Sequence, residues 1–528
     1  MRLRKSMKWG ATTASAVALL AAASLVTASA SAAAGHEKTL TADTMATWQT
    51  DGIVWSIEYA DDVVYVGGSF SKVRPPGAKP GEREVARKNF AAFDADTGSL
   101  LPCAPRLTGA GNTVRALKAS PSGEALYIGG SFTRADKTRA AGAVALDTFD
   151  CSVRKDFRPA VSGYVHAIDV TENAVYLGGG FTTVNGRDRE RIAAFTPSGK
   201  LLPFKAEIEA PVRAVLAVPE HGKVLVGGDF YMVNGDLEKS LVALHPRTGK
   251  TVTSYGDWVP PRSSVKALAR DKTNFYAAAE GTGTGIFDGR LAGRLGTGKM
   301  VWKDTCLGAT QAITVHKGVL YSGSHAHNCR DTPGGFPEIH ARQHFLAQSV
   351  RDKRILHWFP DTNGGTGEGN GPRALEMVGE VLWAGGEFTK VNGVPQQSLT
   401  RFSPGPDRGA PEAVPRLKAS TSAGGRVKLT WRASWDRDDA KLTYLIYRDG
   451  VLVASPTGRS AEWRRPMMTY TDSVAPGSRH QYRIAVTDGK NASPRSDALA
   501  VTAVADERPK TERPKAERPK VDRPKDKR

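Results

Sequence analysis

The sequence predicts an all-β protein: a seven-bladed β-propeller over residues 35–406, then a β-sandwich over residues 411–503 and a disordered tail over residues 504–528. Three observations predict this order. A segment of the type Val-Tyr-Val-Gly-Gly-Ser-Phe recurs along the first part, strands of alternating polarity follow it, and the chain ends in repeated Arg-Pro-Lys. A β-rich repeat of about 50 residues cannot bury its own faces and must stack on its neighbours, as propeller blades do.

Seven copies of the recurring segment predict seven blades. Each copy ends a strand with small residues, and the equivalent positions are Gly67, Gly129, Gly178, Gly227, Ala278, Gly323 and Gly385. Each unit is expected to hold four short strands; in the second unit these are Val114–Ala119, Ala125–Gly130, Gly142–Asp147 and Val153–Arg158. Turn residues such as Asn185-Gly186 separate them, because tight turns need positive φ. The copies at Ala278 and Gly323 lack the Gly-Gly-x-Phe pattern.

The third unit carries Gly-Gly-x-Phe-Thr-x-Val-Asn-Gly at residues 178–186, followed by Arg-Ile-Ala-Ala-Phe and a Pro-Ser-Gly turn. This motif resembles the delta-sixty repeat of bacterial β-propellers, and the resemblance extends from Ile53 to about Pro404. It implies a propeller. It implies no catalytic residues, because the activity of that family is largely uncharacterised.

The last unit lacks a fourth strand, since the chain leaves it through Pro404-Gly405-Pro406. Residues Ala46–Gln49 precede the first complete strand and occupy the place where a fourth strand would stand. We expect this N-terminal segment to complete the last blade, which removes an open sheet edge.

The first strands of the units share a pattern of the type Val-x-Ala-Leu, and its second position is the most informative in the sequence. The residues at this position are Trp55, Arg115, His166, Arg213, Lys266, Gln311 and Arg373. In a propeller the first strand lies nearest the central channel, so these side chains are predicted to form a ring rich in cations that attracts an acidic ligand. The alternative is that they lie between blades and satisfy neighbouring carbonyl groups.

The sixth unit concentrates histidines, five of eleven between residues 325 and 357. His325 and His327 stand two apart on an extended segment and would face the same way, so with His344 they are candidates for a transition-metal site. A glycine-rich loop follows, in which Asp361, Asn363 and Glu368 are candidate calcium ligands. No strong ligand spacing is present. The alternative is therefore a hydrogen-bonded loop that holds neither calcium nor a transition metal.

Residues 1–34 are predicted to be a secretory signal, because four basic residues precede the apolar run Ala14–Val26 and small-residue cleavage sites follow. No later stretch is long and apolar enough to cross a membrane. The mature protein is expected to be secreted. Retention at the cell wall after secretion is an alternative that the sequence leaves open. Of the formal net charge of +19, the signal and the tail each carry four, which leaves eleven on the body. This favours acidic partners, while nucleic acid fits poorly without a recognisable binding module.

Four cysteines in an exported chain suggest two disulfides. Three pairings are possible. Sequence proximity and the repeat register favour Cys103–Cys151 and Cys306–Cys329. The alternative is that some of these cysteines are buried free thiols.

Residues 411–503 alternate as sandwich strands around Trp431, Tyr444 and Tyr482. Over its whole length this part resembles a fibronectin type III domain. The resemblance implies that Trp431 is a core residue of the second strand and that Tyr482 is the corner tyrosine. The resemblance also implies a role as a spacer or adhesive module, because domains of this type look like such modules in secreted bacterial proteins. The tail has almost no apolar residues and regular prolines, so it is predicted to be an extended spacer.

No nucleophile–base constellation stands out. The sequence therefore predicts a secreted, monomeric, non-catalytic binding or scaffold protein that acts at the cell surface or on extracellular glycan or wall polymer. The alternative is a polysaccharide-degrading glycosidase with the propeller as its catalytic domain. That activity requires two carboxylates about 5–9.5 Å apart in one pocket. Asp229 and Glu387 share one repeat position but lie three blades apart, so they fit this requirement badly.

Overall fold

The computed structural model describes residues 37–109, 111–283, 285–339, 342–363 and 371–505. The predicted signal, and the tail apart from its first two residues, lie outside these ranges. The described residues form β-strands and one short 3-10 helix, η1 (Pro219–His221), which confirms the all-β class. None of the described helical segments is long and apolar enough to cross a membrane.

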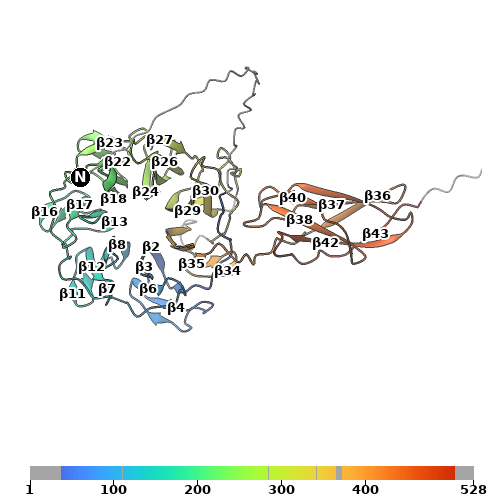
Figure 1. The fold of residues 1–528 in the computed structure, drawn as a ribbon, viewed down its shortest axis with the longest axis horizontal. Helices are drawn as coiled ribbons and strands as arrows, with labels where there is room; N and C mark the ends of the chain where they lie inside the picture. Colours follow the sequence, from blue (N-terminus) through green and yellow to red (C-terminus); the bar gives the residue numbers. More distant parts are fainter. Residues whose placement is uncertain (1–36, 110, 284, 340–341, 364–370, 506–528) are drawn as a thin grey trace, which may run out of the picture. The chain divides into compact units, whose positions relative to one another are not determined.

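Seven antiparallel sheets follow one another along the described chain, and we number them 1 to 7 in chain order (Figure 1). Their first strands are β2 (Ile53–Ala60), β8 (Val114–Ala119), β13 (Val165–Val170), β18 (Val212–Val218), β24 (Ser263–Arg270), β28 (Thr310–His316) and β31 (Pro372–Val378). Their second strands are β3 (Val63–Ser69), β9 (Ala125–Gly130), β14 (Val175–Gly179), β19 (Lys223–Gly228), β25 (Asn274–Gly281), β29 (Val319–Ala326) and β32 (Val381–Gly386). Their third strands are β6 (Phe90–Asp94), β12 (Ala143–Asp147), β17 (Ile192–Phe195), β22 (Leu241–Leu244), β26 (Arg290–Arg294), β30 (Gln343–Ser349) and β35 (Leu399–Phe402).

A regular fourth strand occurs only in sheets 4 and 5 of the described chain, as β23 (Thr251–Ser254) and β27 (Met300–Lys303). In sheet 2 the predicted strand Val153–Arg158 is reduced to one bridge between Leu146 and Val153. Similar single bridges stand at this place in sheets 1, 3 and 6. The repeat pattern therefore predicts the position of the outer strand but overstates its length.

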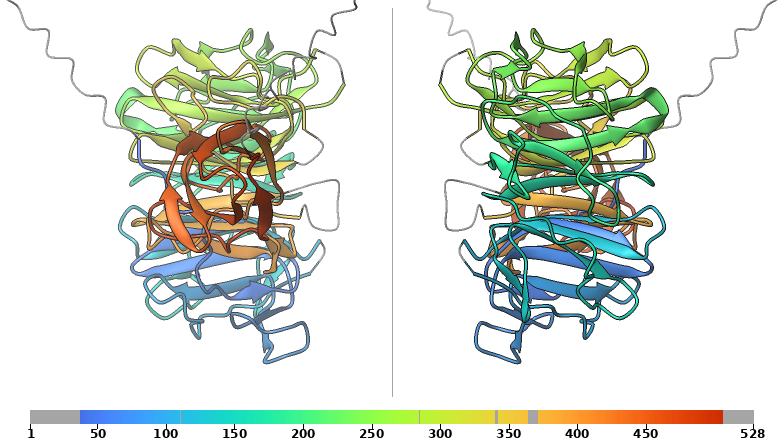
Figure 2. Two further views of the ribbon diagram at one scale, coloured as in Figure 1. Left: turned by 90° about the vertical axis from the view of Figure 1, so that its right-hand side faces the viewer. Right: turned by 90° about the vertical axis from the view of Figure 1, so that its left-hand side faces the viewer.

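The seven sheets close into a propeller-like ring, because each first strand contacts the first strands of both neighbouring sheets and β31 contacts β2. In the edge-on views of Figure 2 the strands run from one face of this ring to the other. The first glycine of each pair allows the close approach. A Cβ atom at Gly67 would lie 2.4 Å from Val114 Cγ1 of sheet 2, and one at Gly385 would lie 2.2 Å from Val54 Cγ1 of sheet 1. The same contact thus joins sheets 1 and 2 and closes the ring.

The N-terminal segment completes sheet 7, as predicted, but with earlier residues. Thr44 forms an antiparallel bridge with Phe402, and Met45 N donates to Arg401 O over 2.9 Å. The predicted segment Ala46–Gln49 is displaced outward, and β1 (Gln49–Thr50) pairs instead with β4 (Lys72–Arg74). Pairing with the last sheet removes its free edge.

A short hairpin follows the second strand in five sheets. These hairpins are β4/β5 (Lys72–Arg74, Val85–Ala86), β10/β11 (Arg134–Ala135, Thr138–Arg139), β15/β16 (Thr183–Val184, Arg187–Asp188), β20/β21 (Met232–Val233, Asp236–Leu237) and β33/β34 (Lys390–Val391, Val394–Pro395). Sheets 5 and 6, whose copies lack Gly-Gly-x-Phe, have no such hairpin among the described residues. Both predicted disulfides, Cys103–Cys151 and Cys306–Cys329, are present.

The C-terminal residues 417–502 form two further antiparallel sheets. One has the order β36 (Leu417–Ser422), β37 (Arg426–Arg432), β41 (Met467–Ser473). The other has the order β39 (Val451–Ala454), β38 (Lys441–Arg448), β42 (Arg479–Thr487), β43 (Leu499–Thr502), and β40 (Thr457–Arg459) also pairs with β38. Trp431 and Tyr482 are buried in their shared core, and Tyr482 Oη donates to Asp472 Oδ2 over 2.8 Å.

Sheet 5 contains a fully buried ion pair, because Arg290 and Asp304 have no exposed side-chain surface. Arg290 Nε donates to Asp304 Oδ2 over 2.9 Å, and Gln348 Nε2 from sheet 6 donates to the same oxygen over 2.7 Å. Asp304 Oδ1 accepts from Thr332 Oγ1 over 2.6 Å and from Cys306 N over 2.8 Å. The carboxylate therefore joins sheets 5 and 6 to the segment that the second disulfide holds.

Replacing Asp304 by Ala is expected to lower the free energy of unfolding by about 3–5 kcal/mol, because it leaves the Arg290 guanidinium buried without an anionic partner. Asp352→Ala is the matched control. Its partner Arg354 is exposed, so the loss should stay at or below about 1 kcal/mol. Denaturant unfolding measures both. Equal losses in the two variants would contradict the assigned importance of the buried pair.

Candidate ligand-binding site

A β-bulge occurs at the same place in every first strand of the ring. The register between first and second strand shifts across one residue in each sheet, and these residues are Trp55, Arg115, His166, Arg213, Lys266, Gln311 and Arg373. A bulge takes the extra residue out of the hydrogen-bond ladder and re-aims its side chain. All seven are half-buried. They are the seven residues of the predicted ring, and we call them the ring residues.

The ring residues contact one another across most of the sheet boundaries. The Arg115 guanidinium carbon lies 3.9 Å from the centroid of the Trp55 ring, and that of Arg373 lies 5.2 Å from the same ring. Arg373 Nη1 donates to Gln311 Oε1 over 2.9 Å. In sheets 3 and 4, Arg213 Nη1 lies 2.7 Å from His166 Nε2. Burial and the neighbouring guanidinium groups lower the pKa of His166 to about 3, so this imidazole is neutral at pH 7.

Three carboxylates balance three of the ring cations. Asp229 Oδ2 lies 2.6 Å from Arg213 Nη2, and Asp229 Oδ1 lies 3.6 Å from Lys266 Nζ. Glu280 Oε1 lies 3.8 Å from Lys266 Nζ, and Glu387 Oε2 lies 3.8 Å from Arg373 Nη2. All three carboxylates occupy the repeat position two residues after the first small residue of the pair. Asp229 and Glu387 are recognisable there from the sequence, whereas Glu280 follows Ala278-Ala279 and escapes the Gly-Gly pattern.

Arg115 is the exception among the ring cations. Within the described residues its guanidinium forms neither an ion pair nor a hydrogen bond. It lies over the Trp55 ring in a cation–π contact. Burial lowers the pKa of Arg115, and the nearby Arg213 and Arg373 lower it further. A guanidinium nevertheless remains charged at neutral pH. The ring thus presents one half-buried positive charge that the described carboxylates do not balance.

A second layer of charged side chains lies three residues farther along four first strands, at Glu58, Lys118, Asp169 and Glu376. Lys118 Nζ lies 2.9 Å from Glu58 Oε1, and Ala217 N donates to Asp169 Oδ2 over 2.5 Å. Burial, together with the negative charge of Glu58, raises the pKa of Glu376 to about 8. This layer therefore holds a carboxyl group that keeps its proton at neutral pH.

A polar cavity of 650 Å³ adjoins the ring at sheets 5, 6 and 7. Its lining residues are Glu280, Gly281, Thr282, Gly283, Asp288, Ala309, Gln311, His325, Arg342 and Arg373. Gln311 and Arg373 belong to the ring, so cavity and ring are continuous. The cavity combines carboxylate acceptors with guanidinium and amide donors, as a site for a hydroxyl-rich ligand does.

Two ionisable groups of the cavity are perturbed by burial. Asp288 Oδ1 accepts from Gly281 N over 2.5 Å and Oδ2 accepts from Gly308 N over 3.3 Å, but burial and the charge of Glu280 raise its pKa. Burial lowers the pKa of His325, and its Nδ1 has no hydrogen-bond partner among the described residues. His325 is therefore a neutral imidazole facing this cavity.

The candidate metal residues of the sixth unit do not form one ligand set. His344 Nδ1 lies 3.1 Å from Asp361 Oδ1, and His327 Nδ1 lies 2.7 Å from Glu338 Oε1. Within the described chain, His325, His327 and His344 do not belong to any group whose ligand atoms all lie within 4.8 Å of one another. Glu368 lies outside the described residues. The pattern of alternating histidines thus does not bring them to one point, because His327 pairs with Glu338 and His344 with Asp361.

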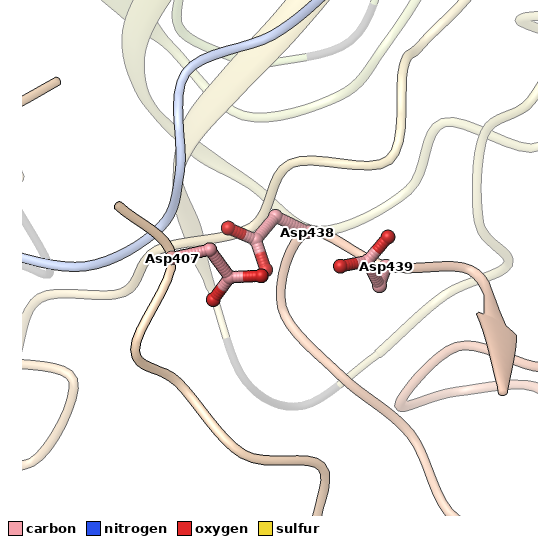
Figure 3. Close-up of side chains that lie close together, drawn as sticks. All are labelled: Asp407, Asp438 and Asp439. Carbon is pink, nitrogen blue, oxygen red and sulfur yellow. The ribbon is translucent and has the colours of Figure 1, made fainter. Parts of the chain in front are cut away.

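One carboxylate group that the sequence does not predict consists of Asp407, Asp438 and Asp439 (Figure 3). Burial and neighbouring carboxylates raise the pKa of Asp438 to about 8. Lys490 Nζ lies 2.8 Å from Asp407 Oδ2 and 3.7 Å from Asp439 Oδ2. Lys490 supplies one positive charge to this group and so offsets part of its negative charge.

A largely apolar cavity of 490 Å³ lies between sheets 3 and 4 and includes Tyr176, Leu202, Pro203 and Val224. It contains none of the ring residues, and Lys223 and Arg247 are its only charged groups among the described residues. The polar cavity at the ring is therefore the stronger candidate for a specific site.

Comparison with known proteins finds structural similarity alone. No family model matches the chain, and no curated protein sequence matches it. The chain is similar to the WD40 β-propeller domain of Doa1, with 12% identity over 68% of this chain and 96% of that chain and a TM-score of 0.43. It is also similar to the computationally designed Ika8 protein, with 14% identity, 69% and 99% coverage and a TM-score of 0.41. A third similar structure is Sqt1 of Saccharomyces cerevisiae, with 9% identity, 88% and 100% coverage and a TM-score of 0.36.

The stability of the protein should fall as the pH rises through neutrality, because the folded state raises the pKa of Glu376 from 4.5 to about 8. The folded chain then binds more protons than the unfolded chain between these values, and this contribution is complete below about pH 4.5 and lost above about pH 8. We expect Glu376→Gln to flatten the decline in melting temperature between pH 5 and pH 8. The exposed Glu172→Gln is the control. Parallel pH profiles for wild type and Glu376→Gln would contradict the assignment.

Proposed function

We propose that this protein is an exported, non-catalytic binding protein that holds an acidic extracellular glycan or wall polymer at its ring. In this proposal the ring is a seven-bladed β-propeller of the delta-sixty repeat type, and the two C-terminal sheets are a fibronectin type III domain. The two disulfides support export, since such bonds persist in oxidising compartments. The positive charge of the body supports an acidic ligand.

The observation that carries the proposal is the unbalanced charge of Arg115. Arg213, Lys266 and Arg373 each have a carboxylate within 3.8 Å, whereas Arg115 lies against Trp55 without one among the described residues. A partly buried charge is costly unless it is paired. An anionic group of a ligand supplies the missing partner, and a guanidinium binds carboxylate, sulfate or phosphate groups through two parallel hydrogen bonds.

Arg115→Gln should weaken binding to polygalacturonate by about 10- to 100-fold, which corresponds to the ~1.5–3 kcal/mol of a hydrogen bond to a charged group. Titration calorimetry measures the affinity, and the wild-type affinity should fall with added salt because screening acts within about 8–10 Å. Arg187→Gln, on the exposed strand β16, is the matched control and should bind as the wild type does.

The melting temperature of Arg115→Gln should stay near that of the wild type, since the described chain offers no ion pair to break at this position. Undiminished binding by a folded Arg115→Gln variant would overturn the proposal. Equal affinity for neutral and acidic glycans would overturn it as well.

A second function is favoured by one observation: Glu280 and Asp288 line the same cavity, and the pKa of Asp288 is raised. An acid with a raised pKa beside an ionised carboxylate is the pairing that glycosidases use. Against this, both oxygens of Asp288 accept hydrogen bonds from backbone N–H groups, and Glu280 Oε2 accepts one from the side-chain amide of Gln311. These bonds hold the two carboxylates in structural contacts and leave only their remaining lone pairs to a ligand.

Release of reducing ends from polygalacturonate and from purified wall polymer separates the two functions. The binding function predicts no release by the wild type over a background set by heat-inactivated protein. Release that Glu280→Gln abolishes, while Arg187→Gln retains it, would establish the hydrolase instead.

A further inference from the structure

The unbalanced cation Arg115 and the polar cavity are connected through one indole ring, that of Trp55. Arg115 and Arg373 both lie over the Trp55 ring, with guanidinium carbons 3.9 Å and 5.2 Å from its centroid. Arg373 also lines the cavity. A ligand group bound to Arg115 is therefore next to Trp55, and the following unit of the same ligand can reach the cavity without leaving the ring.

Two of the sheets that adjoin this cavity lack the short hairpin that follows the second strand elsewhere in the described ring. In sheet 1 the residues on either side of Trp55 pair with Gly68 and Gly67, which lie near the end of the second strand. The ring residues therefore lie at the end of the sheets from which the hairpins start. Hairpins follow the second strands of sheets 1, 2, 3, 4 and 7. Sheets 5 and 6 have none among the described residues, and the cavity lies at the ends of their second strands, beside Gly281 and His325.

The chemistry of the cavity differs from that of the Arg115 position. Arg115 offers one cation over an aromatic ring, whereas the cavity offers Glu280, Asp288 and Gln311 beside Arg342 and Arg373. Such a mixture suits hydroxyl groups, which both donate and accept hydrogen bonds. Its volume of 650 Å³ falls within the range of about 300–1,000 Å³ that encloses a small ligand.

We infer that Arg115 and the cavity are two adjoining subsites of one groove for a linear anionic polysaccharide. The carboxylate of one sugar unit pairs with Arg115, and the hydroxyl groups of a neighbouring unit fill the cavity beside Arg342. The chain of the polymer continues past the ends of β25 and β29, which border the cavity. This inference rests on the proposed function and adds to it that the ligand is a linear chain recognised through at least two units.

Galacturonate and its oligomers of two to six units test this inference by titration calorimetry with the whole protein. Affinity should rise by about tenfold or more from monomer to trimer, because the second subsite adds contacts to the first, and should then level off. Arg342→Gln should abolish this gain with length. Arg115→Gln should weaken binding of oligomers of every length, and the exposed Arg187→Gln should change neither property.

The outcomes separate the inference from the function on which it rests. Binding whose affinity is the same for all lengths, or a gain with length that survives in Arg342→Gln, would overturn the two-subsite groove and leave the proposed function standing. Absence of binding by every oligomer and by the polymer would overturn the proposed function itself. Thermal unfolding of each variant identifies any loss of binding that comes from misfolding, and Arg115→Lys, which keeps the charge, then replaces a misfolded Arg115→Gln.

Discussion

The bulge in the first strand of each sheet is the constraint on which the site depends. In five sheets the residue before the bulge is a Val that packs against a glycine of the neighbouring sheet, while the bulged residue itself leaves the ladder. Thr310 and Pro372 hold the equivalent place in sheets 6 and 7. Because the bulge recurs in all seven sheets, seven side chains that are distant in sequence meet in one ring. The packing that closes the ring and the display of polar groups at its centre thus have one origin.

The cations of the ring differ in whether a carboxylate of the protein pairs with them. Arg213 and Lys266 share Asp229, and Lys266 also faces Glu280, so these cations join neighbouring sheets as struts. Removing one of them would leave a half-buried carboxylate without its partner, which costs stability as well as any binding. Arg115 stacks on Trp55 instead, and no described carboxylate depends on it. The interpretation of the ring residues as struts therefore fits Arg213 and Lys266, whereas our proposal of a ligand site concerns Arg115.

Local periodicity explains which features could be predicted from the sequence. Repeated glycines, turn residues and cysteine spacing are determined within or between neighbouring units, and they predict the closed ring, the disulfides and the seven ring positions. Glu280 could not be recognised because its copy of the motif has lost both glycines. The separation of His327 from His344 depends on the partners Glu338 and Asp361, which strand periodicity does not specify.

The segment that completes sheet 7 and the group of three aspartates could not be predicted from the sequence for a different reason. Thr44 pairs with Phe402, and Asp407 meets Asp438, through contacts that no repeat connects. A pattern of alternating residues identifies a strand but does not choose its register against a distant edge, which depends on side-chain packing.

The crystal structure of the protein with hexagalacturonate tests the central claim most directly. The account predicts one carboxylate about 2.7–2.9 Å from the nitrogens of Arg115, the distance of a charge-assisted hydrogen bond, and a neighbouring sugar in the cavity lined by Glu280 and Arg373. A sugar bound only at the outer strands or at the C-terminal sheets, with Arg115 still lying over Trp55 without an anion, would contradict it.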